Sequence, residues 1–180
     1  MSYAKKINLP VDVGDILNAE RTLIQTTDKK VIGKYRHANW VKFENEPTPL
    51  LMYTLPDEVK QNILSQLPKS LLEREVPGVY LMIMEKPEPT PSMLPPHIDR
   101  ARRCAINIYL ECDDEETQFF EADEKSKSLT LMESFFAKAG ESWAMDVSKP
   151  HAVIMSNAMR RSGVSLSFRR VKYDELASLV

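Results

Sequence analysis

The stretch from Gly140 to Phe168 reads GESWAMDVSKPHAVIMSNAMRRSGVSLSF and holds short runs that favour β-strands. The runs are Ser142–Met145, His151–Met155 and Gly163–Arg169, and turn-forming residues separate them. Short runs rich in β-branched and aromatic residues, bounded by turn residues, are typical of strands. The stretch therefore predicts three consecutive strands near the end of the chain.

The same pattern extends backwards from this stretch to residue 78. Gly78–Glu85 (GVYLMIME) and Arg103–Leu110 (RCAINIYL) are β-prone, and Thr117–Ala122 and Ser128–Met132 are expected to form a hairpin across Asp123–Lys127. Several short strands separated by turns are typical of an all-β barrel or sandwich. The sequence thus predicts a mainly β protein with flanking helices.

The segment between the first two of these runs is rich in proline. Five prolines lie between Pro87 and Pro96. Proline lacks the backbone N–H that a central strand or a helix interior needs. The segment is therefore expected to be neither.

The N-terminal part of the chain has a mixed pattern. Asp15–Ile24 is expected to form a short helix, and a second helix is expected to begin at Thr54 and to end at Pro68. Weaker strand candidates lie near Val31–Tyr35 and Trp40–Phe43. These elements predict a support region that precedes the β core.

Length and composition favour one globular domain. The chain has 180 residues, of which 43% are hydrophobic and 28% charged, with a net charge of −2. We expect a single domain over 1–180, with a helical or mixed support region at 1–75 and a β core at 76–172. No basic footprint indicates a nucleic-acid partner, no apolar run predicts a membrane span, and no secretory signal is visible. Two cysteines make no disulfide framework, which favours a reduced, cytoplasmic protein.

Histidine and aspartate residues suggest a metal site. In an extended chain, side chains two residues apart project to the same side, so His97 and Asp99 can face one point. His151 begins a predicted strand and can add a second imidazole. Two imidazoles and one carboxylate on one face of a metal leave the opposite face open, which suits non-haem Fe(II).

The segment around His151 resembles the end of the double-stranded β-helix, a cupin-like jelly roll, of the Fe(II)/2-oxoglutarate oxygenases. It is most similar to their aspartyl/asparaginyl β-hydroxylase-like branch, through the H-x-D of His97 and Asp99, the histidine in PHAV (150–153), and an arginine at the start of the next predicted strand. The resemblance implies that His97, Asp99 and His151 hold Fe(II) and carry the catalysis. It further implies 2-oxoglutarate and O₂ as cosubstrates and hydroxylation of an unidentified peptide or small molecule, with an Asp, Asn or Pro side chain as a candidate.

In that family the arginine binds the 2-oxoglutarate carboxylate remote from the metal, and two residues here are candidates. If the strand alternates, Arg161 shares a face with small side chains, whereas Arg160 shares a face with aliphatic and aromatic ones. Small side chains leave room for a cosubstrate, so we favour Arg161. Arg160 stays open, because Arg160 to Ser162 reads as the R-x-S of other oxygenase branches.

Further residues are expected to contact the cosubstrate. Asn107 and Tyr109 lie on the non-aliphatic face of the run after the metal motif and are placed to hydrogen-bond it.

Two other functions fit the same sequence. A cupin-like metalloprotein would have the barrel and the metal without 2-oxoglutarate chemistry. A non-catalytic β-barrel binding module would have no tight metal site. This alternative stays open because an H-x-D triplet alone also fits a loop histidine beside a surface pair of Asp99 and Arg100.

Overall fold

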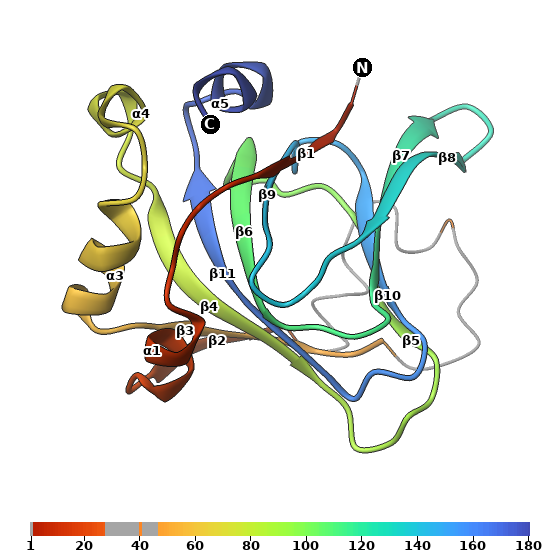
Figure 1. Cartoon of the computed structure of the whole chain (residues 1–180). Coiled ribbons are helices and arrows are strands. Elements are labelled where there is room, and N and C mark those ends of the chain that lie inside the picture. The colour runs from red at the N-terminus through yellow and green to blue at the C-terminus, as the bar shows by residue number, and fades with distance from the viewer. Residues whose placement is uncertain (1, 28–39, 41–46) are drawn as a thin grey trace.

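Two facing antiparallel β-sheets form the centre of the molecule (Figure 1). The computed structural model describes residues 2–27, 40 and 47–180. The strands within this part of the chain are β1 (Ala4–Ile7), β2 (Thr22–Thr27), β3 (Leu50–Thr54), β4 (Gly78–Glu85), β5 (Ser92–His97), β6 (Cys104–Glu111), β7 (Glu116–Asp123), β8 (Ser128–Phe136), β9 (Ser142–Met145), β10 (His151–Met155) and β11 (Arg160–Phe168).

The order of the strands is that of a jelly roll. Within the described residues, the larger sheet has the order β1-β9-β6-β11-β4-β3-β2 and the smaller sheet the order β5-β10-β7-β8. From β4 to β11 the chain crosses repeatedly between β9-β6-β11-β4 of the larger sheet and β5-β10-β7-β8, which gives a core of eight strands, four from each sheet. This is the double-stranded β-helix of cupin-like folds, and the predicted fold class is confirmed.

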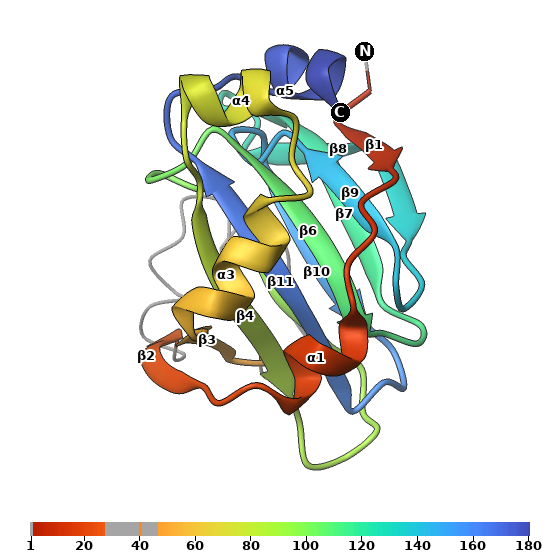
Figure 2. The ribbon, with the colours of Figure 1, turned by 60° about the vertical axis from the view of Figure 1, so that its left-hand side comes forward.

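Helices cover the outer face of the larger sheet, as Figure 2 shows for α1 and α3, with α4 and α5 at one end. Ile106 and Ile108 of β6 and Leu166 of β11 are buried there together with Ile63 and Leu176 of the helices. Burying a side chain of this size contributes about 1.5–3 kcal/mol. The helices are α1 (Val13–Asn18), α3 (Asp57–Leu64), α4 (Lys69–Arg74) and α5 (Tyr173–Leu179).

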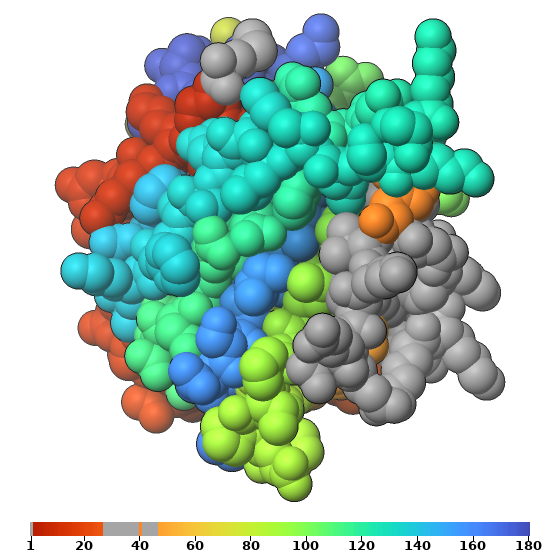
Figure 3. Space-filling model, turned by 90° about the vertical axis from the view of Figure 1, so that its right-hand side faces the viewer, coloured from red at the N-terminus to blue at the C-terminus, as the bar shows by residue number. Residues whose placement is uncertain are grey.

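The smaller sheet presents an outer face that no described helix covers. Figure 3 shows this side of the molecule, with the β7–β8 hairpin across its upper part and the segment joining β4 to β5 at its lower edge. The large apolar side chains of Leu131, Met132 and Phe136 on β8 are exposed. The two sides of the fold therefore differ, because apolar packing against helices is confined to the larger sheet.

Most of the strands predicted from residue 78 onward are confirmed. The bounds of β4, β9 and β10 agree with the expected runs, and the predicted hairpin is formed by β7 and β8. The proline-rich segment contains β5, which the sequence did not predict. β5 lies at the edge of its sheet and pairs with β10 alone, so Pro95 and Pro96 occupy a position that tolerates proline.

The predictions for the N-terminal part need correction. The helix expected over Asp15–Ile24 is wrong beyond Asn18, because Thr22–Thr27 forms β2 and pairs with β3. Pairing across the sheet there outweighs the local helical spacing. Strand candidates near Val31–Tyr35 and Trp40–Phe43 lie outside the described residues, except for Trp40.

The second expected helix is also shorter than predicted. Thr54 ends β3 rather than capping the helix, and Pro56 stands at the N-cap of α3. α3 ends at Leu64, and Pro68 precedes a second short helix, α4, instead of ending the first. Proline suits the first turn of a helix because its missing N–H needs no partner there.

Glu75 ties the segment after α4 to the end of β11. Its buried carboxylate accepts backbone N–H bonds from Arg169 and Arg170 at 2.8 Å each and from Val171 at 3.1 Å. Burial alone would raise the pKa of Glu75, but these three N–H donors outweigh it and hold the pKa below its ordinary value of 4.5. The ionised carboxylate thus fixes the turn that leads into α5.

We predict that Glu75→Gln lowers the free energy of unfolding by about 1–3 kcal/mol at pH 7, since it removes a charged acceptor from buried donors. Because the folded-state pKa lies below 4.5, this contribution is complete above pH 4.5 and is lost as the pH falls through the folded-state value. Urea unfolding at several pH values measures both effects. The exposed Glu73→Gln is the matched control, and an equal loss in both variants would contradict the prediction.

Candidate metal centre

A cavity of about 900 Å³ lies between the inner faces of the two sheets. Its lining includes side chains from β4, β6 and β11 on one side and from β5, β7 and β10 on the other. All six residues that the sequence analysis favoured line this cavity. They are His97, Asp99, Asn107, Tyr109, His151 and Arg161.

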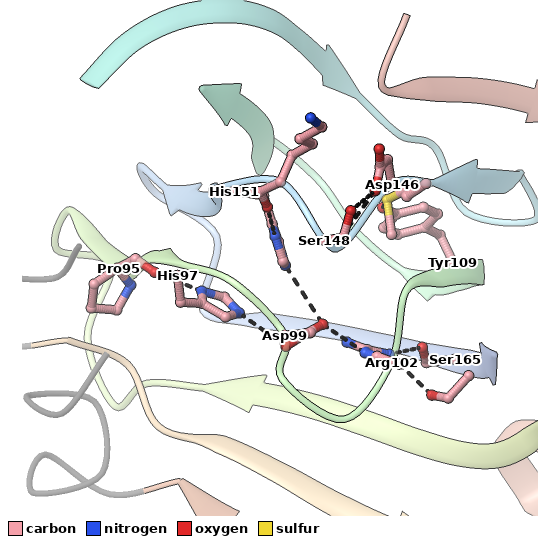
Figure 4. Close-up of polar contacts among 12 residues, drawn as sticks. Pro95, His97, Asp99, Arg102, Tyr109, Asp146, Ser148, His151 and Ser165 are labelled. Atoms are coloured by element: carbon pink, nitrogen blue, oxygen red, sulfur yellow. Dashed lines mark hydrogen bonds and ion pairs between the residues drawn. The ribbon is translucent and has the colours of Figure 1, made fainter. Parts of the chain in front are cut away.

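Strand pairing brings the two histidines together. His97 is the last residue of β5, and it pairs directly with His151, the first residue of β10. Asp99 follows in the next loop, where its backbone N–H donates to the carbonyl of Val147 at 3.1 Å. One ligand atom from each of the three side chains lies within 4.8 Å of the others, and Figure 4 shows them converging.

Backbone carbonyls set the orientation of both imidazoles. Nδ1 of His97 lies 2.7 Å from the carbonyl oxygen of Pro95, and Nδ1 of His151 lies 2.9 Å from that of Lys149. A carbonyl oxygen only accepts, so each Nδ1 carries the proton and each Nε2 the lone pair. Nε2 of His97 and of His151 lie 3.7 Å and 3.8 Å from the carboxylate oxygens of Asp99. This tautomer directs both lone pairs to one point, as a metal site requires.

The surroundings keep the imidazoles neutral and the carboxylate charged. Desolvation, assisted by the neighbouring His151, lowers the pKa of His97 to about 3, and desolvation also lowers that of His151. Burial alone would raise the pKa of Asp99, but the charge and the hydrogen bond of the Arg102 guanidinium oppose it, and the pKa lies below its ordinary value. Neutral nitrogens and an ionised carboxylate are the protonation states that bind a metal, so the donor set fits Fe(II).

Arg102 holds the carboxylate of Asp99 from behind. Its Nε donates to Oδ2 of Asp99 at 2.6 Å, while its Nη1 donates to the hydroxyls of Ser165 and Ser167 at 2.6 Å and 3.1 Å. The guanidinium therefore joins the loop after β5 to the end of β11, as Figure 4 shows. Because a guanidinium is planar, its bonds to the two serines fix the direction from which Nε meets the Asp99 carboxylate.

Arg161 lies elsewhere in the cavity and is buried there. Its Nη2 donates to the hydroxyls of Tyr109 and Thr117 at 3.1 Å each, and its guanidinium carbon lies 5.0 Å from the centre of the Tyr109 ring. Within the described part of the chain, its Nη1 is buried and has no hydrogen-bond partner. An unpartnered buried donor costs free energy, so this nitrogen indicates a place for an anion.

Asn107 and Tyr109 flank the same space from β6. The side-chain oxygen of Asn107 is likewise buried without a partner among the described residues. The hydroxyl of Tyr109 is used by Arg161 and contacts the sulfur of Met145 at 3.9 Å. Asn107 thus lines the cavity with an unpartnered oxygen, whereas the hydroxyl of Tyr109 accepts a hydrogen bond from Arg161.

Arg160 points away from the cavity. Its Nε donates to Glu111 at 2.8 Å, and its Nη1 lies 3.8 Å from Glu85. Successive side chains of a strand point to opposite faces, so adjacent Arg160 and Arg161 of β11 lie on opposite faces of the sheet. Arg160 has carboxylate partners of its own, and Arg161 has none among the described residues.

Sequence patterns did not reveal two parts of this arrangement. Thr117 comes from β7 and meets Arg161 only because the two sheets face each other. The hydrogen bond from Arg102 to Asp99 was not predicted either. Thr117 lies far from Arg161 in the sequence, whereas Arg102 lies only three residues after Asp99, in a loop that has no periodic pattern to mark the contact.

Comparison with known proteins gives weak structural likenesses only. A Momordica charantia 7S globulin matches with a TM-score of 0.40 and 16% identity over 72% of this chain, which spans 32% of the globulin. A Pseudomonas putida prolyl-4-hydroxylase matches with a TM-score of 0.46 and 15% identity over 88% of this chain and 97% of that one. An oxidoreductase of the 2OG-Fe(II) oxygenase family from Burkholderia pseudomallei matches with a TM-score of 0.37 and 12% identity over 89% and 92%. No family model and no curated protein matches the sequence.

We predict that Arg102→Lys weakens metal binding about tenfold, the loss that follows removal of a group orienting a metal ligand. Lysine keeps the positive charge but cannot reproduce the fork between Asp99 and the two serines. Titration with Co(II), followed by visible absorption, measures the affinity. Arg103→Lys, at an exposed neighbouring position, is the control, and unchanged affinity in Arg102→Lys would contradict the prediction.

Proposed function

We propose that this protein is an Fe(II)- and 2-oxoglutarate-dependent dioxygenase that hydroxylates a substrate not yet identified. The observation that carries the proposal is one cavity holding both a two-histidine, one-carboxylate group and a buried arginine with an unpartnered Nη1. The first group suits non-haem iron with open coordination positions, and the second suits a carboxylate. Either feature alone fits many other proteins.

The metal would be held by Nε2 of His97, Nε2 of His151 and the carboxylate of Asp99. When bound, iron supplies O₂ activation, in which 2-oxoglutarate is oxidised to succinate and CO₂ while one oxygen atom enters a C–H bond of the substrate. The protein keeps the imidazoles neutral, aims them through the carbonyls of Pro95 and Lys149, and buries the site against water. These are preparations for binding rather than steps of the reaction.

Arg161 would bind the 2-oxoglutarate carboxylate remote from the metal. Phe119 pairs with His151 across the smaller sheet, and Thr117, which accepts a hydrogen bond from Arg161, lies two residues from Phe119 along β7. Two residues along a strand span about 7 Å. This spacing supports a short dicarboxylate with one end at the metal ligands and the other at Arg161, with Asn107 and Tyr109 beside it.

The sequence resemblance supports a finer assignment. The H-x-D of His97 and Asp99, the distal His151 and the following arginine resemble the aspartyl/asparaginyl β-hydroxylase-like branch. We therefore include an Asp, Asn or Pro side chain among the candidate substrates. Both cysteines are free thiols, which supports the proposal of a reducing, cytoplasmic location. Among the described helices, none is long and apolar enough to cross a membrane.

We predict that anaerobic titration of the Fe(II)-loaded protein with 2-oxoglutarate gives the weak visible charge-transfer band of an iron–2-oxo-acid chelate. Arg161→Ala should weaken 2-oxoglutarate binding at least about tenfold, since it removes a charge-assisted bond to a carboxylate. Arg160→Ala is the matched control, because it removes the same charge at the adjacent residue but only breaks pairs with Glu111 and Glu85.

The other outcomes separate the alternatives. Metal binding with no band at any 2-oxoglutarate concentration would favour the cupin-like metalloprotein. No metal binding in the folded wild-type protein would favour the non-catalytic binding module. Equal effects of Arg160→Ala and Arg161→Ala would argue against Arg161 as the anchor.

A further inference from the structure

The charged side chains that line the cavity are mostly cationic. Four arginines face two carboxylates, apart from the two histidines, which burial keeps neutral. The arginines are Arg100, Arg102, Arg161 and Arg169, and the carboxylates are Asp99 and Glu75. The lining therefore carries two more positive than negative charges.

Both carboxylates already have partners. Asp99 binds Arg102, and Glu75 accepts three backbone N–H bonds. Arg161 lies deep between Tyr109 and Thr117. Arg100 and Arg169 are exposed, and within the described residues neither guanidinium has a hydrogen bond or an ion pair.

The fold brings Arg100 and Arg169 to the same end of the cavity. Arg100 lies in the loop after β5, directly after Asp99, and Arg169 directly follows β11. Three hydrogen bonds tie this loop to the end of β11. Arg102 donates to Ser165 and Ser167, and the N–H of Arg103 donates to the carbonyl of Phe168. Arg161 stands near the other end of β11.

The proposed cosubstrate does not remove this excess of positive charge. A divalent metal and a 2-oxoglutarate dianion cancel, so the lining keeps two unbalanced positive charges when both are bound. A cleft of one sign with apolar walls concentrates ligands of the opposite sign. Leu50, Met52, Met82 and Met84 supply such a wall on β3 and β4.

We propose that the substrate carries an anionic group, a carboxylate or a phosphate, which Arg100 and Arg169 bind at the end of the cavity opposite Arg161. The guanidinium groups form charge-assisted, bidentate hydrogen bonds with such groups. An apolar part of the same molecule lies along the methionine side of the cavity. That the anion belongs to a substrate rests on the proposed oxygenase function, whereas the anion site itself rests only on the lining.

Matched pairs of small ligands test the site without turnover. The full chain is loaded with Zn(II) and saturated with 2-oxoglutarate. It is then titrated with each member of two pairs, hexanoate with its neutral counterpart hexanamide, and hexyl phosphate with its neutral counterpart hexanol. Saturation-transfer NMR follows binding. We expect each acid to bind more tightly than its neutral counterpart. The tighter of the two acids identifies the carboxylate or the phosphate as the preferred group.

The double variant Arg100→Gln/Arg169→Gln should weaken binding of the preferred acid about tenfold or more, as expected for losing charge-assisted hydrogen bonds. Arg103→Gln removes a charge from an exposed neighbour outside the cavity lining, and it should leave binding unchanged. Circular dichroism checks that each variant is folded. We expect all of them to fold, because the substituted side chains are exposed.

Three results would overturn the inference: neutral ligands that bind as well as acids, a loss in Arg103→Gln equal to that in the double variant, or no loss in the double variant. The same titration without Zn(II) and 2-oxoglutarate separates the two proposals. Acid binding through Arg100 and Arg169 in a protein that binds neither metal nor 2-oxoglutarate would refute the oxygenase and keep the anion site.

Discussion

The register between β5 and β10 is the constraint on which the rest of the site depends. It sets His97 opposite His151, and a slip of one residue would turn one imidazole to the outer face of the sheet. The pairing of β10 with β5 is irregular between His151 and Val153, and such irregularities re-aim side chains near functional sites. On the other side of β10, the ring of Phe119 stacks on that of His151 with centroids 5.8 Å apart. Both neighbours of β10 therefore act to hold one imidazole.

A cavity of this kind lowers the stability of the fold that contains it. Each polar atom that is buried without a partner among the described residues, such as Nη1 of Arg161 or the oxygen of Asn107, costs about 1–3 kcal/mol. In an ordinary sandwich the inner faces of the two sheets supply the core. Here the outer face of the larger sheet packs against helices and supplies the largest apolar cluster, so the interior is left for polar groups. The helices thus support the site without touching the metal ligands.

The sequence predicted those parts of the fold that local alternation controls. Ile106 and Ile108 face the helices and Tyr109 faces the interior, as the pattern of β6 requires. β1 was not predicted, because two of its four residues are lysines and its pairing with β9 brings together opposite ends of the chain. α5 was also missed. Its seven residues are too few for a clear helical period, and the backbone turn before it depends on the distant Glu75.

The residues of the site likewise divide into those that strand alternation predicts and those that it does not. His97 and Asp99 could be recognised together because one intervening residue puts both on one side of an extended chain. Alternation likewise separated Arg161 from Arg160 before any contact was known. What alternation cannot supply is the partner across the cavity. Thr117 meets Arg161 through the packing of separate strands, and Arg102 meets Asp99 through the conformation of the loop after β5. Both contacts are properties of the folded chain.

The N-terminal region gains a role from its position rather than from any motif. β3 pairs with β4 so that Leu50 lies opposite Met84 and Met52 opposite Met82, and these side chains continue the cavity wall beyond the eight-stranded core. The metal ligands and Arg161 all belong to that core, between β5 and β11. An added hairpin can therefore change the shape of the cavity while the metal ligands and the anchor stay in place. The structure therefore places the metal ligands and the anchor on the core, and it places a further part of the cavity wall on β3, where no sequence motif marks it.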